Sequence, residues 1–233
     1  VCISENSREK ELQYIDLLYS HRVLGIVVCS HIGETMEHLD SNCPLISFER
    51  EIAENIPAVL CDNYQGGILA ANRLFDAGCR NIAIFNPPTK ENIPAYSREK
   101  AFMKCCDDKK ISGRVVYTDR LAPLSEEFGN NILELLKKNS DLDGIFATSD
   151  VMAANIIRAC KKMGKRVPED ISIVGFDDTW ISTLTYPSIT TIHQPVQEMC
   201  EYAIEAIVKK VKSEKVPSQV VFPVELIDRE STK

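Results

Sequence analysis

Short apolar runs alternate with amphipathic stretches along most of the chain. The apolar runs lie at 24–29, 44–48, 58–61, 82–85, 144–147 and 171–174. Between and after them, apolar residues recur at helical spacing in 10–19, 66–75, 98–106, 126–137, 151–163 and 195–212. Short runs without polar alternation are typical of strands buried on both faces of a parallel sheet. Repeated strand and helix in this order predict an α/β fold, with parallel sheets flanked by helices on both faces.

Polar and glycine residues mark the ends of several expected helices. Asp62 and Ser149 stand directly before two helical stretches, where their side chains are suited to N-capping. Gly78 and Gly164 follow two of the stretches, at positions typical of a helix C-terminus.

Polar side chains also follow the expected strands. They are Ser30, Glu49, Asp62, Asn86, Ser149 and Asp177. Parallel strands of one sheet point the same way, so these residues should share the carboxyl edge of their sheet. Ligands bind at that edge in open α/β sheets. We therefore expect the functional residues there.

The segment 166–178, RVPEDISIVGFDD, is the clearest example of polar residues at the end of an expected strand. Its apolar run leads through Gly175 and Phe176 to Asp177 and Asp178, just past the strand end. A carboxylate there can accept two hydrogen bonds from a polyhydroxy ligand. Alternatively, the pair simply caps the following segment. The local pattern alone favours capping.

Length and composition limit the functional classes. The chain has 233 residues, enough for one large domain or two modest ones, with 44% hydrophobic and 26% charged residues, as in ordinary soluble proteins. The net charge of −7 argues against this polypeptide itself gripping a phosphate backbone. No apolar run approaches membrane-spanning length, and the N-terminus does not resemble a secretory signal. The nine cysteines contain no CxxC pair, which indicates reduced thiols in a cytoplasmic protein.

Signatures of common catalytic sites are missing. The sequence has no GxGxxG, no Walker loop and no GxSxG, and its histidines lack metal-binding spacing. Two-carboxylate catalysis would need Asp177 and Asp178 aimed at one bond, whereas consecutive residues past a strand point apart. We therefore expect no enzyme, cofactor or metal. His193 could reach a ligand cleft, although a hinge or surface histidine fits its position better.

Two further residues have alternative interpretations. Arg98 follows a proline-containing loop at 86–96 and either forks to a ligand or is an exposed arginine at a helix start. Trp180, the only tryptophan, follows the aspartate pair in an expected loop. It either stacks on a sugar ring or anchors a protein interface, and the interface is favoured.

Several motifs occur in one order along the chain. They are AVLCDNYQGG (58–67), LFDAGCRNIAI (74–84), SREKAF (97–102), DGIFATSD (143–150), RVPEDISIVGFDD (166–178), PSITTIHQP (187–195) and ELIDREST (225–232). Together they resemble the effector-binding domain of the LacI/GalR (lac repressor) family of bacterial transcription regulators. The resemblance covers essentially the whole chain.

This resemblance implies two Rossmann-like lobes of periplasmic-binding-protein type I, joined by three crossovers. One lobe would take 1–61 plus 193–216, and the other 62–192 plus 217–233. A sugar or nucleoside-like effector would bind in the cleft between the lobes. By motif match, Asp177 would accept hydrogen bonds from hydroxyls, Arg98 would clamp the ligand and Ser149 would lie beside it. Further candidates are Ser30, Phe48, Glu49, Tyr64 and Gln194.

The chain departs from the family pattern at three places. Ser149 stands where Asn is frequent, and Leu124 where a stacking aromatic is frequent. The family's DNA-binding headpiece, first strand and first helix are not seen, and Val1 enters at what resembles the second strand. We therefore expect a longer native protein whose headpiece reads operator DNA.

By the same resemblance, the native protein would form a homodimer through the helix from Val151 and the loop around Trp180. The alternative function is a solute-binding protein of a sugar transporter, which would require export.

Overall fold

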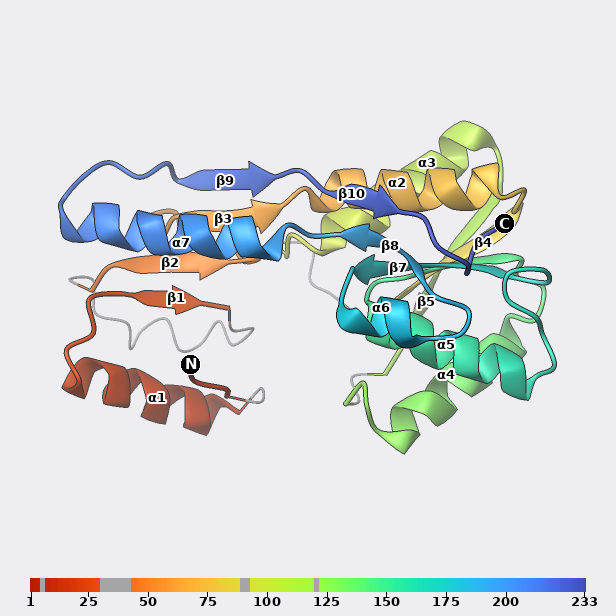
Figure 1. The fold of residues 1–233 in the computed structure, drawn as a ribbon, viewed down its shortest axis with the longest axis horizontal. Coiled ribbons are helices and arrows are strands. Elements are labelled where there is room, and N and C mark those ends of the chain that lie inside the picture. Colours follow the sequence, from red (N-terminus) through yellow and green to blue (C-terminus); the bar gives the residue numbers. More distant parts are fainter. Residues whose placement is uncertain (5–6, 30–42, 89–92, 120–121) are drawn as a thin grey trace. The chain divides into compact units, whose positions relative to one another are not determined.

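The computed structural model describes residues 1–4, 7–29, 43–88, 93–119 and 122–233. Its contacts divide the chain into two compact units. The first contains Val1–Cys61 and Pro195–Phe222, and the second contains Asp62–Gln194 and Pro223–Lys233. Each unit therefore contains one segment from earlier in the chain and one from its C-terminal part, which is blue in Figure 1. The third crossing falls after residue 222, rather than at the expected position near 217.

The first unit is built on a four-stranded parallel sheet of order β1-β2-β3-β9. Its elements are α1 (Arg8–Ser20), β1 (Ile26–Val28), β2 (Leu45–Phe48), β3 (Ala58–Cys61), α7 (Val196–Val211) and β9 (Gln219–Phe222). Helix α7 runs along β2 and β3 (Figure 1), burying Met199, Ala203 and Ala206. β9 pairs with β3, which is why residues 219–222 belong to this unit.

The expected strand at the start of the chain is not formed. Residues 1–4 have no regular secondary structure, and the side chains of Val1 and Ile3 are exposed. A strand exists only where a neighbour completes its hydrogen-bond ladder. No ladder in the described part of the chain reaches these residues, so the prediction of a strand there is wrong.

The second unit has a six-stranded sheet of order β10-β8-β7-β6-β4-β5, parallel except for β10, which pairs antiparallel with β8. The strands are β4 (Asn81–Asn86), β5 (Ser112–Tyr117), β6 (Gly144–Ala147), β7 (Ser172–Asp177), β8 (Thr190–His193) and β10 (Glu225–Ile227). The helices are α2 (Asn63–Asp76), α3 (Tyr96–Lys109), α4 (Glu126–Lys138), α5 (Asp150–Lys162) and α6 (Trp180–Leu184). Figure 1 shows α2 and α3 on one side of this sheet and α4 and α5 on the other.

On the α2–α3 side of the sheet, a row of buried aromatic rings ends next to the carboxyl edge. Phe102 packs on Phe146 with ring centroids 5.8 Å apart, and Phe146 packs on Phe176 at 6.3 Å. All three rings are fully buried, each stabilising the unit by about 1.5–3 kcal/mol. The row ends at Phe176, the residue before Asp177. The core thus fixes the backbone from which the candidate carboxylate projects.

The predicted helix ends are confirmed. Asp62 Oδ1 accepts a hydrogen bond of 2.8 Å from the backbone N–H of Gln65 at the start of α2. Ser149 caps α5 in the same way. Gly78 and Gly164 have φ of 88° and 73° just past α2 and α5, a conformation that costs glycine little.

Candidate functional site

The backbone turn after β7 is strained. Asp177 and Asp178 have φ of 103° and 55°, values that residues with a side chain rarely adopt. Such residues cost about 1–3 kcal/mol each and persist only where the surroundings hold them. Asp177 Oδ1 accepts a 2.6 Å hydrogen bond from Gln194 Nε2. Two predicted site residues, from the ends of adjacent parallel strands, therefore meet at this turn.

Arg98 is buried, with 7% of its surface exposed, in the first turn of α3. Its guanidinium carbon lies 3.4 Å from the centre of the Phe176 ring, a cation–π contact worth about 2 kcal/mol when desolvated. Its Nε donates to Asn63 Oδ1 at 2.5 Å, and its Nη1 donates to the carbonyl oxygen of Thr148 at 3.2 Å. The alternative of an exposed arginine is wrong. Arg98 packs against the residue preceding Asp177, so both belong to one edge of the second unit.

Two glycines of α2 allow this packing. A Cβ on Gly66 would lie 2.7 Å from the Phe176 ring, and one on Gly67 would lie 2.3 Å from the carbonyl oxygen of Arg98. Gly66 and Gly67 therefore permit close approach of α2 to β7 and α3. Tyr64 is half-buried in the first turn of the same helix, beside the Asn63 that holds Arg98.

Ser149 lies at the same edge, half-buried after β6. Its Oγ accepts a 3.2 Å hydrogen bond from the backbone N–H of Met152, so the side chain caps α5. Capping was the favoured interpretation from the sequence. A hydroxyl used as an acceptor by a helix can still donate to another group.

Asp150, the last residue of the DGIFATSD motif, organises the turn. Its side chain is fully buried. Oδ2 accepts hydrogen bonds from the backbone N–H of Thr179 (2.6 Å) and its Oγ1 (3.1 Å), and Oδ1 accepts from Thr191 Oγ1 (2.6 Å). Burial raises the pKa of Asp150, while these hydrogen bonds act to lower it. Gly175 makes room, because a Cβ there would lie 2.5 Å from Asp150 Oδ1.

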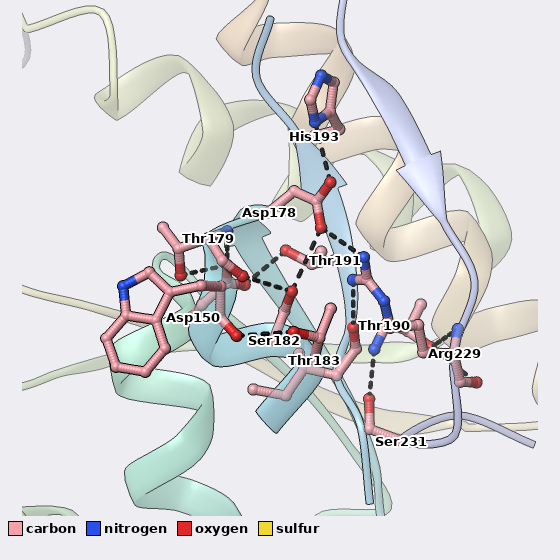
Figure 2. Close-up of polar contacts among 12 residues, drawn as sticks. Asp150, Asp178, Thr179, Ser182, Thr183, Thr190, Thr191, His193, Arg229 and Ser231 are labelled. Atoms are coloured by element: carbon pink, nitrogen blue, oxygen red, sulfur yellow. Dashed lines mark hydrogen bonds and ion pairs between the residues drawn. The ribbon is translucent and has the colours of Figure 1, made fainter. Parts of the chain in front are cut away.

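The second carboxylate of the pair has partners of its own. Asp178 Oδ1 accepts from Arg229 Nη2 at 2.7 Å, and Asp178 Oδ2 lies 3.0 Å from His193 Nδ1 (Figure 2). Burial acts to raise the pKa of Asp178, but the hydrogen bonds from Arg229 and His193 outweigh it and the pKa is lowered. Asp177 and Asp178 thus bind different partners, which does not fit two-carboxylate catalysis. His193 contacts the network around the turn.

A further polar cluster lies at the ends of β4, β5 and β6. Buried Glu99 accepts hydrogen bonds from Asn86 Nδ2 (3.1 Å) and the Tyr117 hydroxyl (3.0 Å). Thr148 Oγ1 donates to Asn86 Oδ1 at 3.2 Å. Asn86 had been recognised as a strand-end residue, but Glu99 and Tyr117 had not, because their contact joins a helix to a distant strand.

Two of the candidates in the first unit, Phe48 and Glu49, lie at the end of β2. Phe48 is half-buried at the strand end. Glu49 has φ of 53°, and its Oε1 accepts a hydrogen bond from the backbone N–H of Cys61. Ser30 lies outside the described residues.

Three large apolar residues around α6 are exposed. Trp180 begins this short helix, rather than lying in the expected loop. Trp180, Leu184 and Tyr186 are 71%, 73% and 92% exposed. Leu124, where the family pattern favours an aromatic, is 86% exposed.

Within the described residues, we find no support for a nucleophilic thiol at Cys106 or Cys160, for a metal site or for a membrane-spanning helix. Burial raises the pKa of Cys106 to about 12 and that of Cys160 to about 11, so both thiols stay protonated at neutral pH. No three His, Cys, Asp or Glu side chains of the described ranges are arranged to hold a metal ion. In the same ranges, no helix is long and apolar enough to cross a bilayer.

Comparisons with known proteins agree with this architecture. A family model for the periplasmic binding protein-like domain matches residues 71–232. A ribose operon repressor of Halalkalibacterium halodurans is 31% identical over 234 residues, which cover 100% of this chain and 70% of the relative. A sucrose operon repressor of Streptococcus mutans is 28% identical over 231 residues, covering 99% and 70%.

A solved structure is also similar over the full chain. It is a periplasmic binding protein/LacI transcriptional regulator from Alkaliphilus metalliredigens, complexed with D-xylulofuranose. The identity is 33% and the TM-score 0.86, covering 100% of this chain and 86% of that one. The chain belongs to the periplasmic binding protein-like domain family, as an effector-binding domain of the LacI/GalR type.

Proposed function

We propose that this domain senses a sugar or a related polyhydroxy molecule. The observation that carries the proposal is one edge of the second unit, where the turn bearing the Asp177 carboxylate adjoins the buried Arg98 guanidinium. A carboxylate accepts hydrogen bonds from hydroxyl pairs, and a guanidinium donates to hydroxyl and ring oxygens. Relatives that repress ribose and sucrose operons, and a similar structure that holds D-xylulofuranose, support this ligand class.

Each candidate residue has a proposed role. Asp177 accepts hydrogen bonds from ligand hydroxyls, Arg98 donates to the ligand, and Ser149, Tyr64 and Gln194 complete the contacts from the second unit. From the first unit we propose Phe48, Glu49 and Ser30. The ligand would then bind residues of both units and stabilise a closed arrangement of them.

The ligand can regulate the protein if the open and closed arrangements of the two units bind it with different affinities. A ligand shifts a conformational equilibrium only by its differential affinity, and typical coupling amounts to about 1–3 kcal/mol. We propose that closure changes the operator affinity of a full-length regulator that carries a separate DNA-binding headpiece. Mobility-shift titrations of the full-length protein on operator DNA, with and without sugar, test this step. An operator affinity unchanged by a sugar that binds would refute it.

We also propose that the regulator is a homodimer. Trp180, Leu184 and Tyr186 form an exposed apolar group around α6, next to α5. Exposed aromatic residues of this kind are frequent anchors of protein interfaces. Sedimentation equilibrium of the wild type and of Trp180→Ala gives the test. A wild type that stays monomeric at micromolar concentration contradicts a dimer, and an equally tight dimer in the variant contradicts this surface.

The sugar proposal is tested by calorimetric titration with D-ribose, D-xylulose, sucrose and adenosine. Asp177→Asn removes a charge-assisted hydrogen bond, so the dissociation constant should rise about 10- to 150-fold. Asp170→Asn is the matched control, because it removes an exposed carboxylate that is bound to Arg166 at 2.7 Å. Unchanged affinity of the Asp177 variant would disprove its role. A wild type that binds none of the four compounds would count against the ligand class itself.

A further inference from the structure

The turn that carries Asp177 also carries Asp178, whose carboxylate contacts side chains of the protein. Figure 2 shows Asp178 with His193 and Arg229 as separate partners. Ser182 Oγ, fully buried in α6, lies 3.3 Å from Asp178 Oδ1 and 2.7 Å from the carbonyl oxygen of Thr179. Both oxygens of Asp178 are therefore engaged, and only 17% of its side chain is exposed.

The partners of Asp178 lie on two segments distant in sequence. His193 ends β8, two residues before the chain passes to the first unit at 194–195. Arg229 follows β10, on the segment that returns at 222–223. Arg229 Nη1 also donates to the carbonyl oxygen of Ile189 at 2.9 Å, so its own position is fixed. Asp178 thus ties the turn to both segments.

The ion pair in this contact requires a carboxylate. Asparagine tolerates positive φ about as well as aspartate, so the backbone alone does not demand Asp178. An asparagine side chain has only one oxygen acceptor. Its oxygen could accept from Arg229, and its amide nitrogen could donate to His193 Nδ1 in the tautomer that carries no proton there, but the ion pair with Arg229 would be lost.

We propose that Asp178 is a positioning residue for the effector. By holding Arg229 and His193, it fixes the strained turn in the conformation that presents Asp177. It makes no contact with the sugar itself. This inference rests on the proposed sugar-binding function of Asp177.

The experiment compares Asp178→Asn with Asp170→Asn, since each removes the charge of an aspartate paired with an arginine at 2.7 Å. Loosening the turn means that the ligand must order it on binding, which weakens affinity by about tenfold. We expect this increase in dissociation constant for D-ribose, D-xylulose or sucrose with the Asp178 variant alone. Amide hydrogen exchange of 176–180 in ligand-free protein should become faster in that variant. A role in global stability alone would speed exchange throughout the second unit.

The outcomes separate this inference from the proposed function. If the wild type binds a sugar and Asp178→Asn binds it equally well, the positioning role is refuted. If the wild type binds no sugar, the function fails, and hydrogen exchange still decides whether Asp178 holds the turn. Unchanged amide exchange at 176–180 in Asp178→Asn would refute the role of Asp178 in holding the turn. If Asp178→Asn does not fold, His193→Ala removes one partner of the same carboxylate. The expected result is faster exchange confined to the turn, and unchanged exchange is the refutation.

Discussion

Replacing Asp150 tests how the site edge is held together. Its two oxygens accept hydrogen bonds from the backbone of Thr179 and the hydroxyl of Thr191, each at 2.6 Å. Asp150→Ala leaves both donors without that acceptor, and Thr191 is fully buried. An unsatisfied buried donor costs about 1–3 kcal/mol, so the free energy of unfolding should fall by about 2–5 kcal/mol.

Asp150→Asn removes the negative charge of the side chain but keeps an oxygen that accepts hydrogen bonds. The amide oxygen can accept from Thr179, while the amide nitrogen can donate to the Thr191 hydroxyl. We therefore expect an unfolding free energy within about 1 kcal/mol of the wild type at neutral pH. Because burial raises the pKa of Asp150 above 3.8, the folded wild type binds its proton more tightly than the unfolded chain. Wild-type stability relative to the asparagine variant should fall as pH rises from 3.8 through the folded-state pKa.

Urea unfolding followed by fluorescence provides the measurement. Trp180 is the only tryptophan and directly follows Thr179, so its emission reports on this turn. Far-UV circular dichroism of the same samples shows whether the rest of the chain unfolds with it. The reasoning is refuted if alanine costs less than about 1 kcal/mol, or if asparagine is as damaging as alanine.

Three smaller perturbations test individual features. Gly67→Ala places a Cβ 2.3 Å from the carbonyl oxygen of Arg98, so stability should fall by about 1–3 kcal/mol and sugar affinity with it, as thermal denaturation and calorimetry would show. Ser149→Ala removes the cap on Met152 and should cost about 1 kcal/mol in urea unfolding. Gly78→Ala, at φ of 88° with no neighbour within 4 Å, should cost about 1–2 kcal/mol through backbone strain alone, and an unchanged melting temperature would contradict this.

The sequence predicted features whose signals are local. The apolar runs become the buried strands β3, β4, β6 and β7, because short runs without regular polar alternation are typical of strands covered on both faces. Asp62 and Ser149 were recognisable as caps because the capped N–H lies only three residues away. The strand-end position of Asp177 followed from the same pattern.

The networks behind the site could not be predicted, because their partners are far apart along the chain. Asp150 contacts Thr191 across 41 residues, and Asp178 contacts Arg229 across 51. Sheet order and register decide such contacts, and local patterning specifies neither. The strand expected at the start of the chain did not form for a related reason, since strand formation depends on a neighbouring strand as well as on apolar composition.

The aspartate at position 177 affects both the stability of the turn and the proposed function. Glycine would adopt φ of 103° with little strain, whereas a residue with a Cβ costs about 1–3 kcal/mol there. The 2.6 Å hydrogen bond from Gln194 Nε2 gives Asp177 Oδ1 a partner within the protein, but an asparagine oxygen could accept it equally, so this bond alone does not require a carboxylate. Neighbouring carboxylates compensate for the strain, as Asp178 binds Arg229 and Asp150 binds the Thr179 backbone. Asp150 and Asp178 thus hold the geometry of the edge, and we propose that the carboxylate at Asp177 serves the ligand.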